Sequence, residues 1–372
     1  MQDPRSVKLA RLIIEHSTRL EAGEAILIES FDVTGGLVSD LVEAAQRAGG
    51  VPLVHLRDQQ VIRQLVEKGN KAQFELQADI ELYQMKKVQA YVGLRGAANV
   101  SELSGIDPEQ MTLYTQTVAS PVHMDQRVNH TRWVVLRYPT ASMAQLAQMG
   151  TRAFEDFFYR VCTLDYPRME EATRPLVERM QKTDEVRIKG PGTDLRFSIK
   201  NVGVAPCYGR RNLPDGECFT APVRDSVSGT IAFNTPSLYL GTSYRDIRFT
   251  FEGGRIVKAE GEPAAHLEHL LDTDEGARHI GEFSLGFNPF IEQPMKDTLF
   301  DEKIAGSLHF TPGQAYKEAD NGNRSRIHWD LVLIQRSDFG GGEIWMDGEC
   351  IRRDGRFIVP ELEGLNPERL AG

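Results

Sequence analysis

The 372-residue chain has few cysteines, and its four are scattered, with no CxxC pair and no zinc-finger spacing. This pattern predicts buried or free thiols in a reducing compartment, so we expect a cytoplasmic protein. The first residues lead into no long apolar run, and no stretch of roughly 18 apolar residues occurs anywhere. We therefore expect neither a signal peptide nor a membrane-spanning segment.

Several chemical motifs are also missing. No GxGxxG follows the first expected strand, and neither GxxxxGK[ST] nor GxSxG occurs in the chain. Phosphate-cradling and serine-hydrolase chemistry therefore lack the residues they need. The formal net charge is −10, from 43 basic and 53 acidic residues. This surplus of acid argues against nucleic acid or an anionic membrane as the main partner.

The first half alternates short apolar stretches with amphipathic ones. This alternation predicts βαβ units and a doubly wound, mostly parallel sheet. A long helical region then connects the halves at 141–182, interrupted near Tyr166–Pro167. The expected strands are 25–30, 51–57, 88–96 and 132–139, and the expected helices are 4–20, 37–48, 60–68 and 71–87.

After Lys182 the chain becomes a series of short β-type segments separated by Gly, Asn and Asp. Gly253–Gly254 and Asp354–Gly355 are typical of two-residue hairpin turns, and one helix is expected at 263–271. The chain is also long for a single core. We therefore predict an α/β domain with linking helices over 1–180 and a β-rich α+β catalytic domain over 181–372.

The region Gly281–Asp330 concentrates residues that can bind metals. Carboxylates and neutral imidazoles are ligands that Zn, Mn, Co or Fe(II) accept. His328 and Asp330 stand two apart in IHWDLVLI, an expected strand, so both side chains should point to one face. Upstream, the turn residues Pro214–Gly216 should present Glu217 at the start of a short strand. The region also holds Glu282, Glu302, His309 and Tyr316.

Five motifs in this half, taken in order, resemble the family of thermophilic aminopeptidase T and aminopeptidase S. They are GTDLRFSI, NLPDGECFTAPVRDSVSGT, RHIGEFSLGFNP, DEKIAGSLHFTPGQAY and IHWDLVL. The resemblance covers the C-terminal half, whereas the N-terminal half matches only in its strand–helix alternation. It implies a metallo-aminopeptidase with two divalent ions per chain (Zn, Co, Mn or Mg), a peptide substrate and a homodimer.

Carried over by position, the resemblance implies six metal ligands and one further catalytic residue. Glu282 matches the carboxylate that lies between the two metals, and it is our first choice for the group that receives a proton. Tyr316 matches a tyrosine close to the metals, and we expect its hydroxyl to donate to the oxyanion. The implied ligands are Glu217, Glu282, Glu302, His309, His328 and Asp330. The interval from Tyr316 to His328 is shorter than in the best-known members, so substrate preference does not follow from the resemblance.

Three other readings remain open. The RHIG motif and the HxD of His328–Asp330 resemble 2,5-dihydroxypyridine dioxygenase, which would use His279, His328 and Asp330 to hold one Fe(II). Glu217, Glu282 and His309 argue against this interpretation, because that type of enzyme lacks the corresponding acids and histidine. A hydrolase of a non-peptide amide could use the same two-metal site, and an inactive relative could serve only in binding.

Overall fold

The computed structural model describes residues 3–372. Its contacts divide the chain into two compact units: unit 1 runs to Thr163 and includes Gly209–Leu213, and unit 2 comprises Leu164–Tyr208 and Pro214–Gly372. The boundary therefore lies before helix α9 (Tyr166–Lys182) and not near residue 180. The reason is that α9 packs on strands β7 and β9 and on the short helix η6, which all belong to unit 2.

Unit 1 contains a five-stranded sheet in the order β2-β1-β3-β4-β8, and every neighbouring pair is parallel. The strands are β1 (Ala25–Phe31), β2 (Val51–Arg57), β3 (Ala90–Arg95), β4 (Arg132–Arg137) and β8 (Asn212–Leu213). The helices are α1 (Pro4–Leu12), η1 (Ile13–Ser17), α2 (Leu37–Arg47), α3 (Gln59–Lys68), α4 (Lys71–Lys87), α5 (Pro108–Tyr114), η2 (Thr115–Arg127), α6 (Val128–His130), α7 (Ala141–Leu146) and α8 (Thr151–Cys162).

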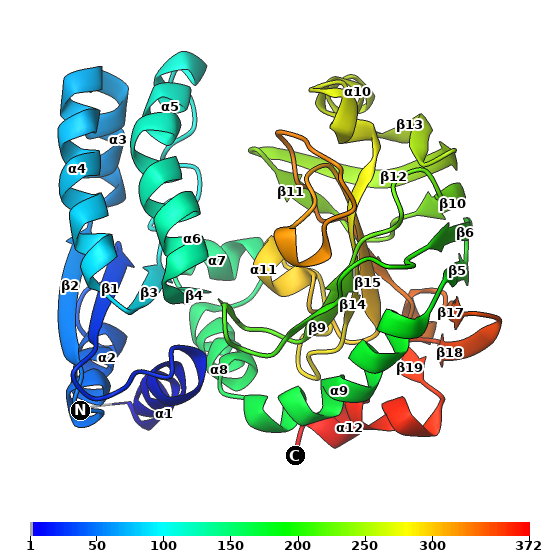
Figure 1. Ribbon diagram of the computed structural model, residues 1–372, viewed down its shortest axis with the longest axis horizontal. Coiled ribbons are helices and arrows are strands. Elements are labelled where there is room, and N and C mark those ends of the chain that lie inside the picture. The colour runs from blue at the N-terminus through cyan, green and yellow to red at the C-terminus, as the bar shows by residue number, and fades with distance from the viewer. Residues whose placement is uncertain (1–2) are drawn as a thin grey trace. The chain divides into compact units, whose positions relative to one another are not determined.

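Helices cover both faces of this sheet, because alternate residues of a buried strand point to opposite sides. On one face, Leu27 and Tyr91 pack with Met85 of α4 and Val122 of η2. Ile26 and Ile28 point to the other face, and α2 packs on β1 and β2. The doubly wound parallel arrangement expected for the first half is thus present in unit 1 (Figure 1).

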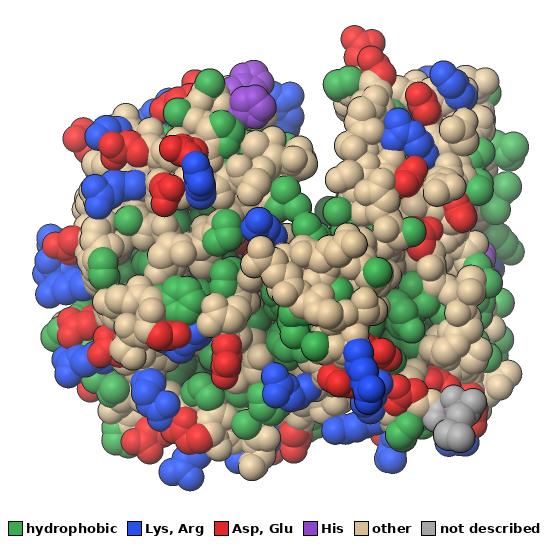
Figure 2. Space-filling model, turned by 180° about the vertical axis from the view of Figure 1, so that it is seen from behind, with side chains coloured by type: hydrophobic (Ala, Val, Ile, Leu, Met, Phe, Trp, Pro, Cys, Tyr) green, Lys and Arg blue, Asp and Glu red, His purple; other side chains and the backbone are tan. Residues whose placement is uncertain are grey.

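Unit 1 also exposes a row of large apolar side chains. They lie on the edge strand β2 and on the outer sides of α3 and α4, and hydrophobic side chains are visible along the right-hand edge of Figure 2. We call them the β2–α4 patch: Val51, Leu53, Val54, Leu56, Val61, Leu65, Leu76, Ile80 and Tyr83. No helix within residues 3–372 has the length and apolar character needed to cross a membrane.

Unit 2 contains two antiparallel sheets. The larger has the order β11-β12-β10-β6-β5-β17-β18-β19, with β13 beside β12, and the smaller has the order β16-β15-β14-β9-β7. The strands are β5 (Glu185–Gly190), β6 (Thr193–Ser198), β7 (Ala205–Cys207), β9 (Glu217–Thr220), β10 (Ser228–Ala232), β11 (Ser237–Tyr239), β12 (Thr242–Glu252), β13 (Arg255–Glu262), β14 (Ile280–Gly286), β15 (Ser307–Pro312), β16 (Val332–Ile334), β17 (Glu343–Met346), β18 (Glu349–Arg353) and β19 (Arg356–Phe357).

Short helices connect these strands. Besides α9 they are α10 (Ala264–Leu271), η3 (Glu275–Arg278), α11 (Thr298–Asp301), η4 (Lys317–Ala319), η5 (Ser337–Phe339), η6 (Pro360–Leu365) and α12 (Pro367–Leu370). Both expected hairpin turns are present: all four of their residues have positive φ, which two-residue hairpins of this type require. The β-rich character expected after Lys182 is therefore confirmed.

The two sheets of unit 2 pack through aromatic residues. Phe197 of β6 contacts Phe283 of β14 and Phe310 of β15, with ring centroids 5.0 and 5.2 Å apart. Because side chains alternate along a strand, Glu282 and His309 must point away from this apolar layer. One face of β14 and β15 thus forms the core, and the opposite face is available for a polar site.

Candidate metal centre

The centre of the site is the polar face of β14 and β15. In the antiparallel register Ser284 lies opposite His309, and Glu282 lies opposite Thr311. Glu282 is 3% exposed, and its Oε1 is 3.1 Å from Nε2 of His309. His309 is fully buried, so this pair is shielded from water. Two expected ligands therefore meet because neighbouring strands present them on one face.

Glu217 reaches the same face from β9. It is the first residue of that strand and lies opposite Gly286 of β14, as the turn before it led us to expect. Gly216 has a φ of +134°, and a Cβ there would approach Asn288 to 3.1 Å, so glycine suits this turn. The Ser284 hydroxyl donates to Oε2 of Glu217 at 2.9 Å, which fixes the carboxylate.

His328 and Asp330 also enter the site, although not from the expected strand. Strand β16 covers only Val332–Ile334, and His328 forms an isolated bridge with Gly313. The expectation of a strand over the whole of IHWDLVLI was therefore wrong: Trp329 donates one backbone hydrogen bond to Pro312 of β15 at 3.2 Å, but regular strand pairing begins only at Val332. Nδ1 of His328 lies 2.8 Å from the Gln314 carbonyl oxygen, which leaves Nε2 free to face the acids.

Nε2 of His328 is 3.3 Å from Oε2 of Glu282 and 3.2 Å from Oδ1 of Asp330. The Thr311 hydroxyl donates to the same Asp330 oxygen at 2.7 Å. Glu282 therefore contacts both imidazoles, one through each carboxylate oxygen. Glu282 thus links the two histidines of the site.

Glu302 follows the short helix α11 and completes the set. Its carboxylate contacts the ammonium group of Lys303, which also lies 2.5 Å from Oε1 of Glu217. Lys303 is fully buried, and Asp215 lies 3.8 Å from the same ammonium group. One buried cation thus stands among three carboxylates.

The six expected ligands fall into three overlapping groups. In each group one ligand atom per residue lies within 4.8 Å of the others. Glu282, His309 and Asp330 each belong to two of the groups, so the groups share members. The groups are Glu217–Glu282–His309, Glu282–His328–Asp330 and Glu302–His309–Asp330. This overlap suits more than one cation.

The pKa shifts show how strongly the site concentrates negative charge. Burial opposes protonation of His309, but Glu217 and Glu282 beside it raise its pKa to about 9. The pKa of Glu302 is raised to about 8, chiefly by burial; the charges of Glu217 and Asp330 add to this shift, and Lys303 opposes it. Burial would also raise the pKa of Asp330, but His328 holds it well below its usual value. A surplus of buried carboxylate is what a site for divalent cations requires.

Tyr316 stands at the rim of this site. Its ring centroid is 4.5 Å from that of His328 and 5.7 Å from that of Phe219. The residue is 47% exposed, yet its hydroxyl lies among protein groups. Burial of that hydroxyl raises its pKa, and the Glu282 and Asp330 carboxylates add to the effect, while His328 opposes it. The hydroxyl therefore keeps its proton at neutral pH and can donate a hydrogen bond.

His279 does not join these residues. It is buried, and it belongs to none of the groups that could hold a metal among residues 3–372. Burial lowers its pKa, and the charged groups that act on it belong to Arg224, Asp225 and Arg255, outside the site. The Fe(II) site of His279, His328 and Asp330 is therefore not supported.

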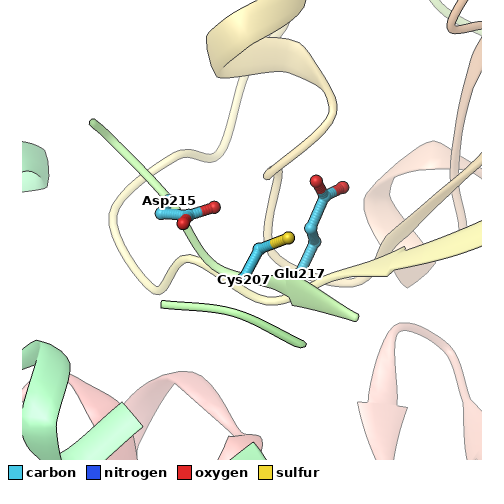
Figure 3. Close-up of side chains that lie close together, drawn as sticks. All are labelled: Cys207, Asp215 and Glu217. Atoms are coloured by element: carbon cyan, nitrogen blue, oxygen red, sulfur yellow. The ribbon is translucent and has the colours of Figure 1, made fainter. Parts of the chain in front are cut away.

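Sequence reasoning missed three residues that lie close to the expected ligands. Lys303 follows Glu302 directly in the DEK motif, and a lysine within a ligand motif could have drawn attention to it. Cys207 lies opposite Glu217 in the β7–β9 pair, and Asp215 precedes that strand. Figure 3 shows Cys207, Asp215 and Glu217 close together, and they form a further group of possible ligands. Nothing in the spacing of Cys207 indicated this position.

Comparison with known proteins gives a consistent picture. The model of the thermophilic metalloprotease family (M29) matches residues 2–357. Aminopeptidase T of Thermus thermophilus is 35% identical over 203 residues, which cover 47% of this chain and 49% of the relative. Aminopeptidase AmpS of Bacillus subtilis is 24% identical over 395 residues, which cover 93% of this chain and 94% of the relative. The chain thus aligns with about half the length of aminopeptidase T.

A solved structure shares the fold. Wild-type AmpT from Thermus thermophilus superimposes with a TM-score of 0.80 at 24% identity, over 95% of this chain and 99% of that one. The mixed arrangement of a parallel sheet and antiparallel sheets is therefore common to both chains.

Proposed function

The chain belongs to the thermophilic metalloprotease family (M29), and from that premise we propose that it is a metal-dependent aminopeptidase. Its substrate is the N-terminal residue of a peptide or a small amide. The observation that carries this proposal is the convergence of six acids and imidazoles into three overlapping groups on the polar face of β14 and β15.

The donor set fits two divalent ions. Buried carboxylates outnumber the buried cations beside them, and oxygen and imidazole nitrogen are ligands that Zn, Co and Mn accept. Glu217, Glu282, Glu302, His309, His328 and Asp330 would hold the ions. Bound there, a pair of divalent ions supplies Lewis acidity to the scissile carbonyl and lowers the pKa of the attacking water.

The chain's own residues supply the rest of the chemistry. Glu282 is fixed between two imidazoles, at 3.1 Å from His309 and 3.3 Å from His328, so it can accept the proton that the attacking water gives up. Tyr316 stays protonated and half-exposed beside His328, so it can donate to the oxyanion that forms from the scissile carbonyl. The free N-terminal amine of a peptide could occupy a coordination position that these residues leave open, which would restrict cleavage to the first residue.

Elemental analysis of gently purified protein tests this function, together with turnover after metal is removed and restored. We expect about two ions per chain and activity on aminoacyl amides that needs no oxygen. Glu217→Gln and His328→Ala should lose both metal and activity while keeping the circular-dichroism spectrum of the parent. Full turnover by either variant without bound metal would refute the assignment.

We also infer that two copies of the chain pair. The family resemblance supports a homodimer, and the β2–α4 patch supports it because β2 is an edge strand with exposed apolar side chains. Sedimentation equilibrium of the parent and of a Leu76→Lys/Ile80→Lys variant tests this inference. A parent that sediments as a monomer at micromolar concentration would contradict it.

A further inference from the structure

Unit 1 contains a buried polar cluster that the proposed reaction does not use. Arg127 is 8% exposed, and its guanidinium carbon lies 4.6 Å from the ring centroid of Trp133 and 5.2 Å from that of Tyr91. The rings of Tyr91 and His123 lie 6.0 Å apart. We call Tyr91, His123, Arg127, Thr131 and Trp133 the Arg127 cluster.

The donors of this cluster lack acceptors. Among residues 3–372, no hydrogen-bond partner is found for the buried Nε and Nη1 of Arg127, Nε1 of Trp133 or Oγ1 of Thr131. Nδ1 of His123 is buried and unpartnered as well. Buried polar atoms are satisfied in the large majority of cases, and an unpaired buried charge is strongly unfavourable. Several unsatisfied donors on neighbouring residues therefore indicate a missing acceptor.

The carboxylate that acts on Arg127, that of Glu29, is already engaged. Glu29 accepts from the Tyr91 hydroxyl at 2.7 Å and from Nε of Arg57 at 2.9 Å. Arg57 also contacts Glu81 at 2.8 Å, so the two acids share one guanidinium. Burial lowers the pKa of Arg127, and Arg95 and Arg211 lower it further, while Tyr91 and Glu29 oppose the shift. Two other guanidinium groups therefore act on Arg127, against one carboxylate that is already shared. An acceptor that is also an anion would suit this position.

The wide turn of η2 brings Arg127 to the sheet. Val118, Val122 and Arg127 are its buried residues, at spacings of four and five. In an α-helix, nine residues are about two and a half turns, so Val118 and Arg127 would point in opposite directions. The i→i+5 bonding of a π-helix lets them share one face, and such segments often occur at functional sites. The local conformation thus places a guanidinium where an α-helix would expose it.

We propose that the Arg127 cluster binds a small inorganic anion, which accepts hydrogen bonds from the unpartnered donors of Arg127, Trp133 and Thr131. The anion neutralises the buried guanidinium and joins η2 to β4 of the parallel sheet. Chloride is the first probe, because a monovalent anion balances the single charge of Arg127. Phosphate and nitrate offer the same acceptor chemistry, and a titration series separates them.

Thermal unfolding in rising chloride, with gluconate holding the ionic strength constant, tests the proposal. We expect the Tm of the intact chain to rise with chloride to a plateau, because an anion that binds only the folded state stabilises it. Arg127→Gln should weaken the apparent chloride affinity about tenfold or more, since it removes a charge-assisted donor. Arg132→Gln is the matched control. Arg132 is exposed on β4, next to Trp133, and its guanidinium pairs with Glu24. It should keep the parent response.

Two further measurements decide the matter if Arg127→Gln fails to fold. Trp133→Phe keeps the ring under the guanidinium and removes only the N–H donor, so it should reduce the chloride response while leaving peptidase turnover unchanged. Crystals grown in bromide should show an anomalous peak within hydrogen-bond distance of Arg127. An unchanged Tm across the chloride series, or water alone at that position in bromide crystals, would overturn the proposal.

Discussion

Two buried polar clusters of opposite charge stand in the two units. In unit 2 the acids Glu217, Glu282, Glu302 and Asp330 surround two imidazoles and one lysine, so negative charge is in surplus. In unit 1, Arg95 and Arg211 act on Arg127, and the acid that acts on it, Glu29, is already paired with Arg57. Each cluster occupies one face of a sheet whose opposite face packs against apolar side chains. Both sites combine strand residues with residues from helices or loops. The sign of the surplus charge decides whether cations or an anion can fill each site.

Reducing the negative surplus in unit 2 should have the largest effect. Glu282→Gln removes the charge from the carboxylate that contacts both imidazoles. We expect kcat/KM on an aminoacyl amide to fall by about a thousandfold or more, because metal binding and proton acceptance both depend on this group. Steady-state kinetics with metal analysis measures the loss. Glu252→Gln, at the exposed end of β12, should behave like the parent, and near-parent turnover by Glu282→Gln would show that the carboxylate is dispensable.

Increasing the surplus of negative charge in unit 2 should lower the stability of the metal-free protein. Lys303→Met leaves Glu217 and Glu302 without their buried cation, and we expect the metal-free protein to lose about 3 kcal/mol of unfolding free energy. Urea unfolding in a chelator measures this loss, and added divalent metal should restore part of it. Lys200→Met is the control, because its pair with Asp184 is exposed. A similar loss of unfolding free energy in both variants would mean that the buried ion pairs of Lys303 stabilise the protein no more than an exposed pair does.

Much of unit 2's site could be predicted from its sequence. The turn residues before Glu217 correctly indicated a strand beginning at that residue, and β-branched and aromatic neighbours indicated that His309 lies in a strand. The motif resemblance placed the six side chains in one site, which no spacing rule could do, since Glu217 and Asp330 are more than a hundred positions apart. Their ligand roles stay a prediction, although the structure brings the side chains together.

The other cluster could not be predicted from sequence, for a physical reason. Its His123 and Arg127 come from the stretch before β4, where Pro121 interrupts any regular helical pattern and the chain forms a π-helix. A reading of the sequence pattern assumes a period of about 3.6 or 2 residues, so it assigns Val118 and Arg127 to different faces.

Lys303 of unit 2 was missed because its burial depends on three acids brought together by the tertiary fold. Tertiary charge balance is not visible in a local pattern.

Acid should weaken the cation-rich cluster of unit 1. Burial lowers the pKa of His123 to about 4; Glu29 opposes this shift, and Arg127, Arg95 and Arg57 add to it. The unfolded chain, with an ordinary histidine pKa of about 6.5, then binds more protons than the folded chain between these values. Stability from this group is therefore full above pH 6.5 and is lost as the pH falls towards about 4, by about 2–3 kcal/mol.

Urea unfolding from pH 7.5 to 4.5 measures this dependence. His123→Gln should flatten it, whereas His130→Gln, at an exposed position in α6, should leave it unchanged. If the parent and His123→Gln lose stability in parallel, the buried imidazole is not the group responsible. That outcome would also weaken the contrast between the two clusters. The arginines around His123 are expected to oppose its protonation, whereas acids around it would favour protonation.

The smallest expected effect concerns a neutral group that touches the acid-rich site. The Thr311 hydroxyl donates to Oδ1 of Asp330 at 2.7 Å, so it orients a carboxylate without changing the charge of the site. Thr311→Val keeps the shape of the β15 side chain and removes this donor. Groups that orient metal ligands typically contribute 10–100-fold to metal affinity, and we expect about tenfold here. Competition with a metal-binding dye measures the affinity, and Thr311→Ser should restore it because it keeps the hydroxyl. If Thr311→Val binds metal as tightly as the parent, surplus charge alone holds the cations, and orientation of Asp330 by its neighbour is unnecessary.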